Sequence, residues 1–141
     1  MKSQHRPILL IDDNPMDVDL TRRAFTRRKV INTIEVARDG EEAIAYIHRL
    51  EEGEAWPVVI LLDINLPKVN GLEVLRELKT HPMLQKIPVI VLTSSGEDRD
   101  IQKAYELGAN SYIVKPVDFE KFVDVAAQID LYWNVINIPP C

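Results

Sequence analysis

The chain has 141 residues, a length that suits one domain built around a single core. With 46% hydrophobic and 28% charged residues, the composition is globular and excludes the disordered and fibrous classes. The net charge of −5 argues against nucleic acid as the main partner. We expect a cytoplasmic protein, because no apolar run reaches membrane-spanning length and no secretory leader is recognisable. A lone cysteine, Cys141, cannot form an internal disulfide.

The chain begins with a strand signal followed by a helix signal. Residues 7–11 form an apolar run that predicts a buried strand, and two aspartates follow it directly. Asn14 is a favourable helix cap, and Pro15 suits the first helical turn. A helix is therefore predicted to about residue 28, with basic side chains over part of its surface.

A second strand and helix come next. Residues 33–37 alternate between polar and apolar side chains, which predicts a half-exposed strand at the edge of a sheet. The turn at Asp39-Gly40 leads into a helix that ends near residue 50. After a polar loop, we interpret Trp56 as a packing anchor rather than a binding residue.

The central strand is predicted at residues 58–62. Five consecutive branched apolar residues indicate a strand that is buried on both faces, and Asp63 lies at its exit. An acid at the carboxyl end of a central parallel strand lies where open α/β sheets bind ligands. The remaining elements are a helix at 71–80, a strand at 88–92, a helix at 98–107, a strand at 111–114 and a helix capped by Asp118 that runs to about residue 133.

Strict alternation of strands and helices predicts an α/β fold with helices on both faces of a parallel sheet. We expect the flavodoxin-like, doubly wound (βα)5 arrangement with strand order 2-1-3-4-5. It forms one domain over residues 1–141, with a core at about 7–130 and an apolar extension at about 131–141. This order places the carboxyl ends of strands one, three, four and five side by side. Five polar residues should meet there: Asp12, Asp13, Asp63, Thr93 and Lys115.

These side chains suggest metal-assisted phosphoryl chemistry. Clustered carboxylates repel one another unless a cation lies among them or one stays protonated. Oxygen ligands from Asp13, Asp63 and a loop carbonyl suit Mg²⁺. Asp63 could accept a phosphoryl group as an acyl phosphate, while Lys115 and Thr93 contact the phosphoryl oxygens. Each residue alone could be a cap or a solvated charge, but four suitable groups at four adjacent strand ends favour the chemical interpretation.

The combination resembles the response-regulator receiver domain, the CheY-like phosphoacceptor of two-component signalling. The resemblance covers about residues 7–130 and implies that Asp63 is the phosphorylated residue. It also implies a Mg²⁺ site made of Asp12, Asp13, Asp63 and the Asn65 carbonyl. The matching motifs are Asp12-Asp13, Leu62-Asp63, Thr93-Ser94 and Lys115-Pro116.

The same resemblance implies roles for the other site residues. Thr93 would be the switch hydroxyl, and Thr93, Ser94 and Lys115 would bind the phosphate. Tyr112 matches the aromatic side chain that turns inward on phosphorylation. The bond between Lys115 and Pro116 is similar to the family's cis peptide.

Two other functions share part of this pattern. A haloacid-dehalogenase-type phosphatase also uses a strand-end aspartate with Mg²⁺, but it needs a second acid where this chain has Asn65. A flavin-binding flavodoxin shares the topology, but Asp12 and Asp13 would repel its phosphate in the absence of a metal. We therefore expect a phosphorylation-gated switch and not a turnover enzyme.

The resemblance implies a sensor histidine kinase as the phosphoryl donor. We expect it to dock near the first helix, where Arg22, Arg23 and Arg27 lie close to the Asp63 edge. The loop before the third strand, residues 109–112 and the C-terminal tail resemble single-domain regulators of bacterial phytochromes. A bacteriophytochrome is therefore the expected kinase.

The C-terminal part suggests a homodimer through the fourth helix, fifth strand, fifth helix and tail. Val125 and Tyr132 widen the apolar face of the last helix beyond what one buried side needs, and apolar residues continue at 135–138. Tyr112 belongs to the same surface, so a two-fold contact would pair like with like. The alternative is that the tail folds back over its own domain.

Overall fold

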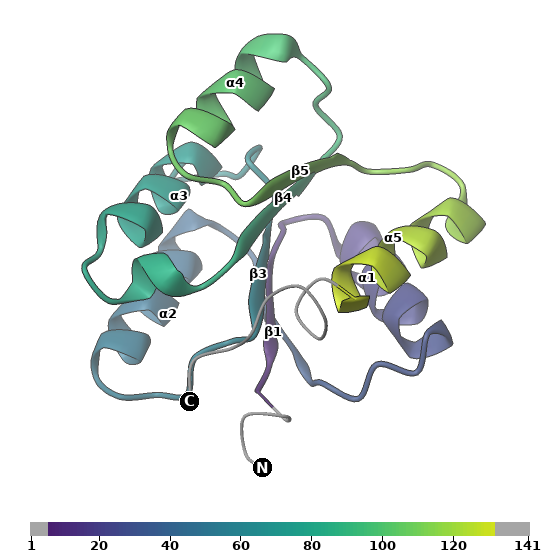
Figure 1. Ribbon diagram of the computed structural model, residues 1–141, viewed down its shortest axis with the longest axis horizontal. Helices are drawn as coiled ribbons and strands as arrows, with labels where there is room; N and C mark the ends of the chain where they lie inside the picture. The colour runs from purple at the N-terminus through teal and green to yellow at the C-terminus, as the bar shows by residue number, and fades with distance from the viewer. Residues whose placement is uncertain (1–5, 132–141) are drawn as a thin grey trace.

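The computed structural model describes residues 6–131, in which strands and helices alternate along the sequence (Figure 1). The strands are β1 (Ile8–Ile11), β2 (Ile34–Ala37), β3 (Val59–Leu62), β4 (Val89–Thr93) and β5 (Ser111–Val114). The helices are α1 (Pro15–Arg27), α2 (Gly40–Glu51), α3 (Gly71–Thr80), α4 (Asp98–Glu106) and α5 (Phe119–Leu131), with a short 3-10 helix, η2 (Leu84–Lys86), before β4. In this part of the chain, no helix has the length and apolar character needed to cross a membrane.

The predicted boundaries agree with these elements to within one residue wherever the two can be compared. The short η2 helix was not predicted. The expected end of the last helix near residue 133 and most of the apolar extension lie outside the described residues.

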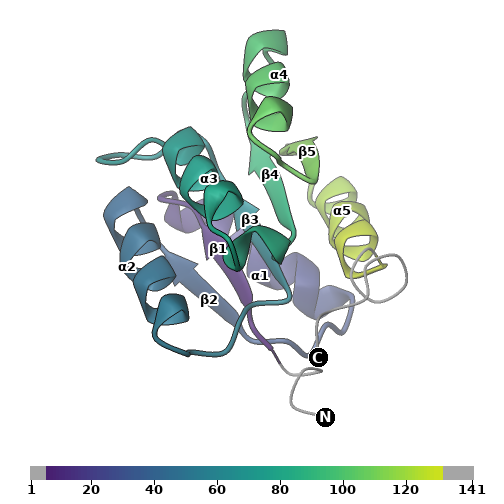
Figure 2. The same ribbon diagram turned by 60° about the vertical axis from the view of Figure 1, so that its left-hand side comes forward.

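All strands pair in parallel in the order β2-β1-β3-β4-β5, which confirms the flavodoxin-like prediction. Helices α1 and α5 cover one face of the sheet, and α2, α3 and α4 lie on the other side (Figures 1 and 2). Alternate residues of a strand enter opposite cores: Leu9 and Ile60 pack toward α2 and α3, whereas Ile8 and Val59 pack toward α1 and α5. The central strands therefore read as continuous apolar runs.

The edge strand β2 has a different pattern, as its alternating sequence predicts. Ile34 and Val36 are half-buried, while Glu35 is exposed. The Glu35 carboxylate accepts a hydrogen bond from the Tyr46 hydroxyl of α2 at 2.6 Å. The guanidinium of Arg49 lies over the Tyr46 ring, 4.8 Å from its centroid. These contacts fasten the edge strand to α2.

Two glycines fix the loop that follows β3. A Cβ on Gly71, the first residue of α3, would collide with the backbone of Ile64 and lie 2.5 Å from the Asp63 carbonyl oxygen. A Cβ on Gly40, at the start of α2, would collide with Val69. The loop after Asp63 is therefore held closely between the first turns of two helices.

A half-buried lysine joins α3 to the segment before β4. The Lys79 ammonium donates hydrogen bonds to the carbonyl oxygens of Gln85 at 3.0 Å and Ile87 at 2.8 Å. Burial lowers the pKa of Lys79 from 10.5 to about 8. Below about pH 8 the folded state therefore contains a charge that is only partly solvated.

This arrangement predicts a pH-dependent contribution to stability. Between about pH 8 and 10.5 the unfolded chain binds a proton at Lys79 that the folded chain does not, so the free energy of unfolding should rise with pH. We expect the free energy of unfolding of the wild-type protein, relative to that of Lys79→Met, to rise by about 1 kcal/mol from pH 8 to 10. The rise is limited to this size because solvent screens a half-buried group. Urea denaturation at several pH values measures it, with Lys86→Met as an exposed control. A wild-type free energy of unfolding that falls relative to that of Lys79→Met as the pH rises would contradict this account.

Candidate functional site

The five predicted strand-end residues meet at the carboxyl edge of the sheet. Backbone hydrogen bonds extend beyond the strand ends, because the Asp63 N–H donates to the Ile11 carbonyl at 2.9 Å and the Lys115 N–H donates to the Thr93 carbonyl at 2.8 Å. The side chains of Asp12, Asp63, Thr93 and Lys115 therefore start from a rigid base. This confirms the juxtaposition expected from the strand order.

Asp63 is only 6% exposed, and both of its carboxylate oxygens accept hydrogen bonds. Oδ1 accepts from the Thr93 hydroxyl at 2.8 Å and from the Asn65 backbone N–H at 2.9 Å. Oδ2 accepts from the Lys115 ammonium at 2.9 Å. A hydroxyl and a cation from the two strands beyond β3 are thus directed at one carboxylate, which is a suitable environment for the oxygens of an anion.

The Lys115 side chain is 7% exposed and pairs with three carboxylates. Its Nζ lies 2.8 Å from Asp12 Oδ2, 2.9 Å from Asp17 Oδ2 and 2.9 Å from Asp63 Oδ2. Burial by itself lowers the pKa of Lys115, but the hydrogen bonds to the three acids outweigh burial and raise that pKa above its ordinary value. Lys115 is therefore a fixed positive charge.

Three acids form a set of oxygen donors that suits a divalent metal. Asp12, Asp13 and Asp63, here called the carboxylate triad, each offer an oxygen, and these oxygens lie within 4.8 Å of one another. Asp12 is buried, and burial raises the pKa of its carboxyl, although the hydrogen bond from Lys115 acts in the opposite direction. Asp13 is exposed, so an ion could bind with much of its hydration intact, as Mg²⁺ prefers.

Residues 8–127 match the family described as the response regulator receiver domain. The chain belongs to this family. FilR2, a probable methanogenesis regulatory protein of Methanothrix harundinacea, is 44% identical over 135 residues, which are 94% of this chain and 86% of FilR2. The response regulator Rcp1 of Synechocystis is 36% identical over 135 residues, covering 94% of this chain and 92% of Rcp1.

Solved structures agree with the family assignment. The phosphorylated cyanobacterial phytochrome response regulator RcpA has a TM-score of 0.88 and 36% identity, over 97% of this chain and 99% of RcpA. The Mn²⁺-bound form of Rcp1 has a TM-score of 0.85 and 33% identity, over 96% of this chain and 99% of the other. The carboxylate triad of this receiver is thus typical of a divalent-metal site. The phosphatase and flavodoxin interpretations are not supported.

One prediction that came from the family resemblance is wrong. Among the residues that the structure describes, no peptide bond is cis, so the bond between Lys115 and Pro116 is trans. Trans is the lower-energy form of a bond before proline in the absence of a contrary constraint. In this form Lys115 already reaches its three carboxylates.

Three other predicted residues lie around the Asp63–Lys115 pair. The Tyr112 side chain is half-buried against the α2 and α3 core, and its hydroxyl donates to the Ser95 carbonyl at 2.8 Å. Ser94 follows Thr93 and is exposed. Asn65 is also exposed, and its side-chain amide donates to the Thr93 hydroxyl at 3.4 Å.

Sequence reasoning missed Asp17. This acid lies in the first turn of α1, where it is one of the three partners of Lys115. An acid in a first helical turn is ordinarily explained by the helix dipole alone. The position of Asp17 in the chain could have indicated its role. Helix α1 begins directly after the acidic end of β1, so its first turn must border the site.

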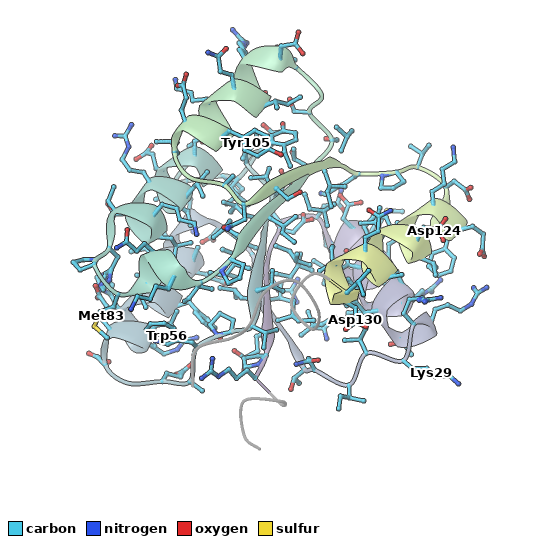
Figure 3. The ribbon with its side chains drawn as sticks, viewed as in Figure 1. Lys29, Trp56, Met83, Tyr105, Asp124 and Asp130 are labelled. Atoms are coloured by element: carbon cyan, nitrogen blue, oxygen red, sulfur yellow. The ribbon has the colours of Figure 1, made fainter. Side chains whose placement is uncertain are left out.

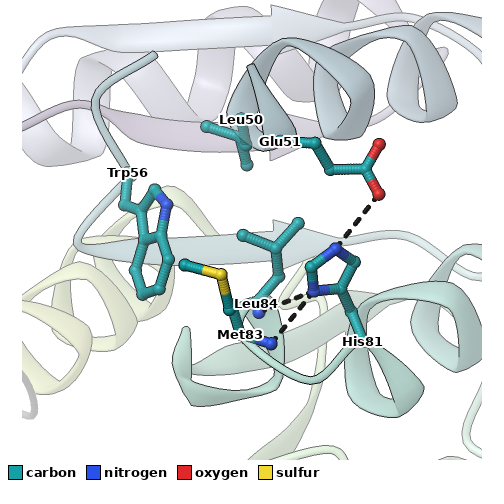
Figure 4. A pocket seen from close by; sticks show the side chains of 6 residues that line it. All are labelled: Leu50, Glu51, Trp56, His81, Met83 and Leu84. Atoms are coloured by element: carbon teal, nitrogen blue, oxygen red, sulfur yellow. Dashed lines mark hydrogen bonds and ion pairs between the residues drawn. The ribbon is translucent and has the colours of Figure 1, made fainter. Parts of the chain in front are cut away.

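The receiver also has an apolar pocket at the opposite edge of the sheet. It is lined by Leu50, Glu51, Trp56, His81, Met83 and Leu84 (Figure 4). His81 Nε2 lies 3.0 Å from a Glu51 oxygen, and His81 Nδ1 accepts from the N–H groups of Met83 and Leu84 at 3.1 Å. Trp56 packs against the core, as expected of an anchor (Figure 3). The lining residues come from segments that lead into the amino ends of β3 and β4, whereas the site residues lie at or beyond the carboxyl ends of β1, β3, β4 and β5, so the pocket is separate from the site.

Proposed function

We propose that Asp63 accepts a phosphoryl group from a phosphohistidine of a sensor histidine kinase. The observation that carries this proposal is the environment of Asp63, a buried carboxylate at a strand end with the Thr93 hydroxyl at 2.8 Å and the Lys115 ammonium at 2.9 Å. A carboxylate so placed can form an acyl phosphate, and both neighbours can bind the oxygens that arrive with the phosphorus.

In this step a bond forms from an Asp63 oxygen to phosphorus, and the bond from phosphorus to the histidine nitrogen breaks, the electron pair leaving with nitrogen. Three equatorial oxygens share the negative charge in the transition state. Lys115 and the Thr93 hydroxyl would each bind one of them, since both already point at Asp63. Mg²⁺, held by the carboxylate triad and the Asn65 carbonyl, would neutralise charge on the third.

The same contacts would make the receiver a switch that is reset by slow hydrolysis, not a turnover enzyme. Once Asp63 is phosphorylated, Thr93 can exchange its hydrogen bond with the carboxylate for one with a phosphoryl oxygen. The exposed Ser94 can add a second contact. Because the Tyr112 hydroxyl donates a hydrogen bond to the Ser95 carbonyl, movement of the loop after Thr93 would also change the position of the Tyr112 side chain.

Incubation with acetyl phosphate and Mg²⁺ tests the proposal. We expect intact mass spectrometry to show one phosphoryl adduct on the wild-type protein and none on Asp63→Asn. Chelation of the metal should suppress the adduct, and Asp13→Asn should raise the Mg²⁺ concentration that the adduct needs. An adduct that survives Asp63→Asn, or none on the wild-type protein, would refute the assignment.

We propose that the upstream kinase is a bacteriophytochrome, since the chain is similar to the phytochrome response regulator RcpA, and that this kinase docks on α1. Arg22 and Arg23 are exposed on this helix, with Arg23 paired to Asp19 at 3.0 Å. Arg27 forms a two-pronged contact with Glu120 of α5, at 3.4 and 3.5 Å. Surface pairs of this kind are weak, so these cations can turn to acidic groups of a partner.

Charge reversal tests the docking surface. The variants Arg22→Glu and Arg23→Glu should slow phosphoryl transfer from a phosphorylated bacteriophytochrome by about tenfold, because complementary charge raises the association rate. Labelling by acetyl phosphate should stay unchanged. Lys103→Glu on α4, on the other side of the sheet, is the matched control. Equal losses with both donors would mean damage to the fold, and no loss with the kinase would exclude this surface.

We further propose a homodimer through α4, β5, α5 and the tail. Tyr105 of α4 is 49% exposed (Figure 3), and Val114 of β5 is 46% exposed. Val117, between β5 and α5, and Leu131, at the end of α5, are also exposed. Val125 packs against the α1 and α5 core, so it adds less to this surface than its position on the helix suggested. Tyr132 and the apolar tail lie outside the described residues.

Light scattering over a range of concentrations tests the dimer. We expect the mass to approach that of two chains at high concentration and to fall when the segment after Trp133 is removed. Tyr105→Glu should act in the same direction, because it places a charge in an apolar contact. A monomer at every concentration, with and without phosphorylation, would exclude the dimer and favour a tail that folds over its own domain.

A further inference from the structure

The acidic edge contains more negative charge than a metal site and a phosphoacceptor need. Asp17 is a fourth carboxylate beside the triad, but it does not belong to the triad whose oxygens could hold a metal ion. Among residues 6–131, Lys115 is the cation that pairs with Asp12, Asp17 and Asp63. One ammonium is thus shared by three acids, of which only Asp63 is expected to be phosphorylated.

The geometry uses every donor of Lys115. An ammonium has three N–H groups, and the three carboxylate oxygens lie at 2.8, 2.9 and 2.9 Å from its nitrogen. A phosphoryl oxygen can therefore bind Lys115 only by replacing one of these acids. Asp63 is the one that gives way, since phosphorylation moves its charge onto the phosphoryl group. Asp12 and Asp17 keep the other two donors.

We propose that Asp17 is a positioning residue that holds Lys115 toward α1 and limits how much of its charge reaches a phosphoryl group on Asp63. This inference rests on the proposed phosphorylation of Asp63. It assigns to Asp17 a role in setting the rate of phosphorylation, separate from metal binding.

The backbone around Asp17 is held by contacts that do not use its carboxylate. The Asn14 side chain accepts from the Asp17 N–H at 3.3 Å, and the Asp17 carbonyl accepts from the Thr21 hydroxyl at 2.8 Å. The Asn14 N–H donates in turn to Asp12 at 3.0 Å. Since the carboxylate is 30% exposed and turned toward Lys115, its charge can be removed without unfolding the turn.

Two opposing effects decide what that removal does. Loss of Asp17 removes one tether of Lys115, which would slow phosphorylation, but it also leaves the ammonium less neutralised, which would speed it. Lys115 keeps its hydrogen bonds to Asp12 and Asp63 and is only 7% exposed, so its position should persist. The charge effect therefore dominates, and Asp17→Asn should raise the rate of labelling by acetyl phosphate by about three- to tenfold.

The experiment compares four proteins at saturating Mg²⁺: wild type, Asp17→Asn, Asp17→Glu and Asp19→Asn. Asp19 is on the same helix and pairs with the exposed Arg23, so its variant removes the same charge away from Lys115. Labelling rate by acetyl phosphate is measured together with the affinity for beryllofluoride, a phosphoryl mimic, and for Mg²⁺ alone. We expect Asp17→Asn to label faster and bind beryllofluoride more tightly, with Mg²⁺ affinity within about twofold of wild type.

Asp17→Glu should return both values toward wild type, and Asp19→Asn should leave them unchanged. A merely structural role would not tighten the phosphoryl mimic while leaving the metal unaffected. If Asp17→Asn folds poorly, Asp17→Ser is neutral and shorter and must act in the same direction. Slower labelling of either neutral variant, or values equal to those of Asp19→Asn, would overturn the inference. If the wild-type protein itself takes no phosphoryl group on Asp63, the proposed function fails first, which is a distinct result.

Discussion

Taking the ammonium of Lys115 out of water costs several kcal/mol unless carboxylates compensate for the lost hydration. The compensating acids come from three places, namely the end of β1, the first turn of α1 and the end of β3, while Lys115 itself follows β5. All must stay within hydrogen-bond distance of one nitrogen. The parallel sheet meets this requirement through backbone ladders that run past the strand ends. In return, the single cation reduces the repulsion among acids that would otherwise oppose folding of this edge.

The two ends of the sheet have separate tasks. At the carboxyl end, charged and polar groups are held close together in an arrangement whose use lies in chemistry. At the other end, apolar side chains, the η2 turn and the half-buried Lys79 join α2, α3 and β4. The carboxylates at the acidic end can therefore stay close together despite their repulsion, because packing elsewhere in the domain supplies the stability.

Most of the fold could be predicted because strand length, apolar runs and capping residues all agreed on each element. The strand-end residues of the site followed from the order of the sheet alone. Asp17 did not, since only the position of α1 relative to β5 shows that its carboxylate reaches Lys115. The isomer of the bond before Pro116 also escaped prediction, because the two forms differ by only about 0.5–1 kcal/mol and context decides between them. For Val125, helical periodicity defines an apolar arc, but neighbouring helices decide how much of it is covered.

The contact between Glu35 and Tyr46 bears on how the molecule behaves beside its neighbours in a crowded solution. An edge strand offers unpaired backbone groups to any other extended chain, and this is a common route to aggregation. In β2 the exposed Glu35 is held in place by the Tyr46 hydroxyl, under the stacked Arg49. A further strand laid along β2 would have to meet or desolvate this anchored charge. The anchored charge therefore disfavours the addition of a foreign strand at this edge of the sheet.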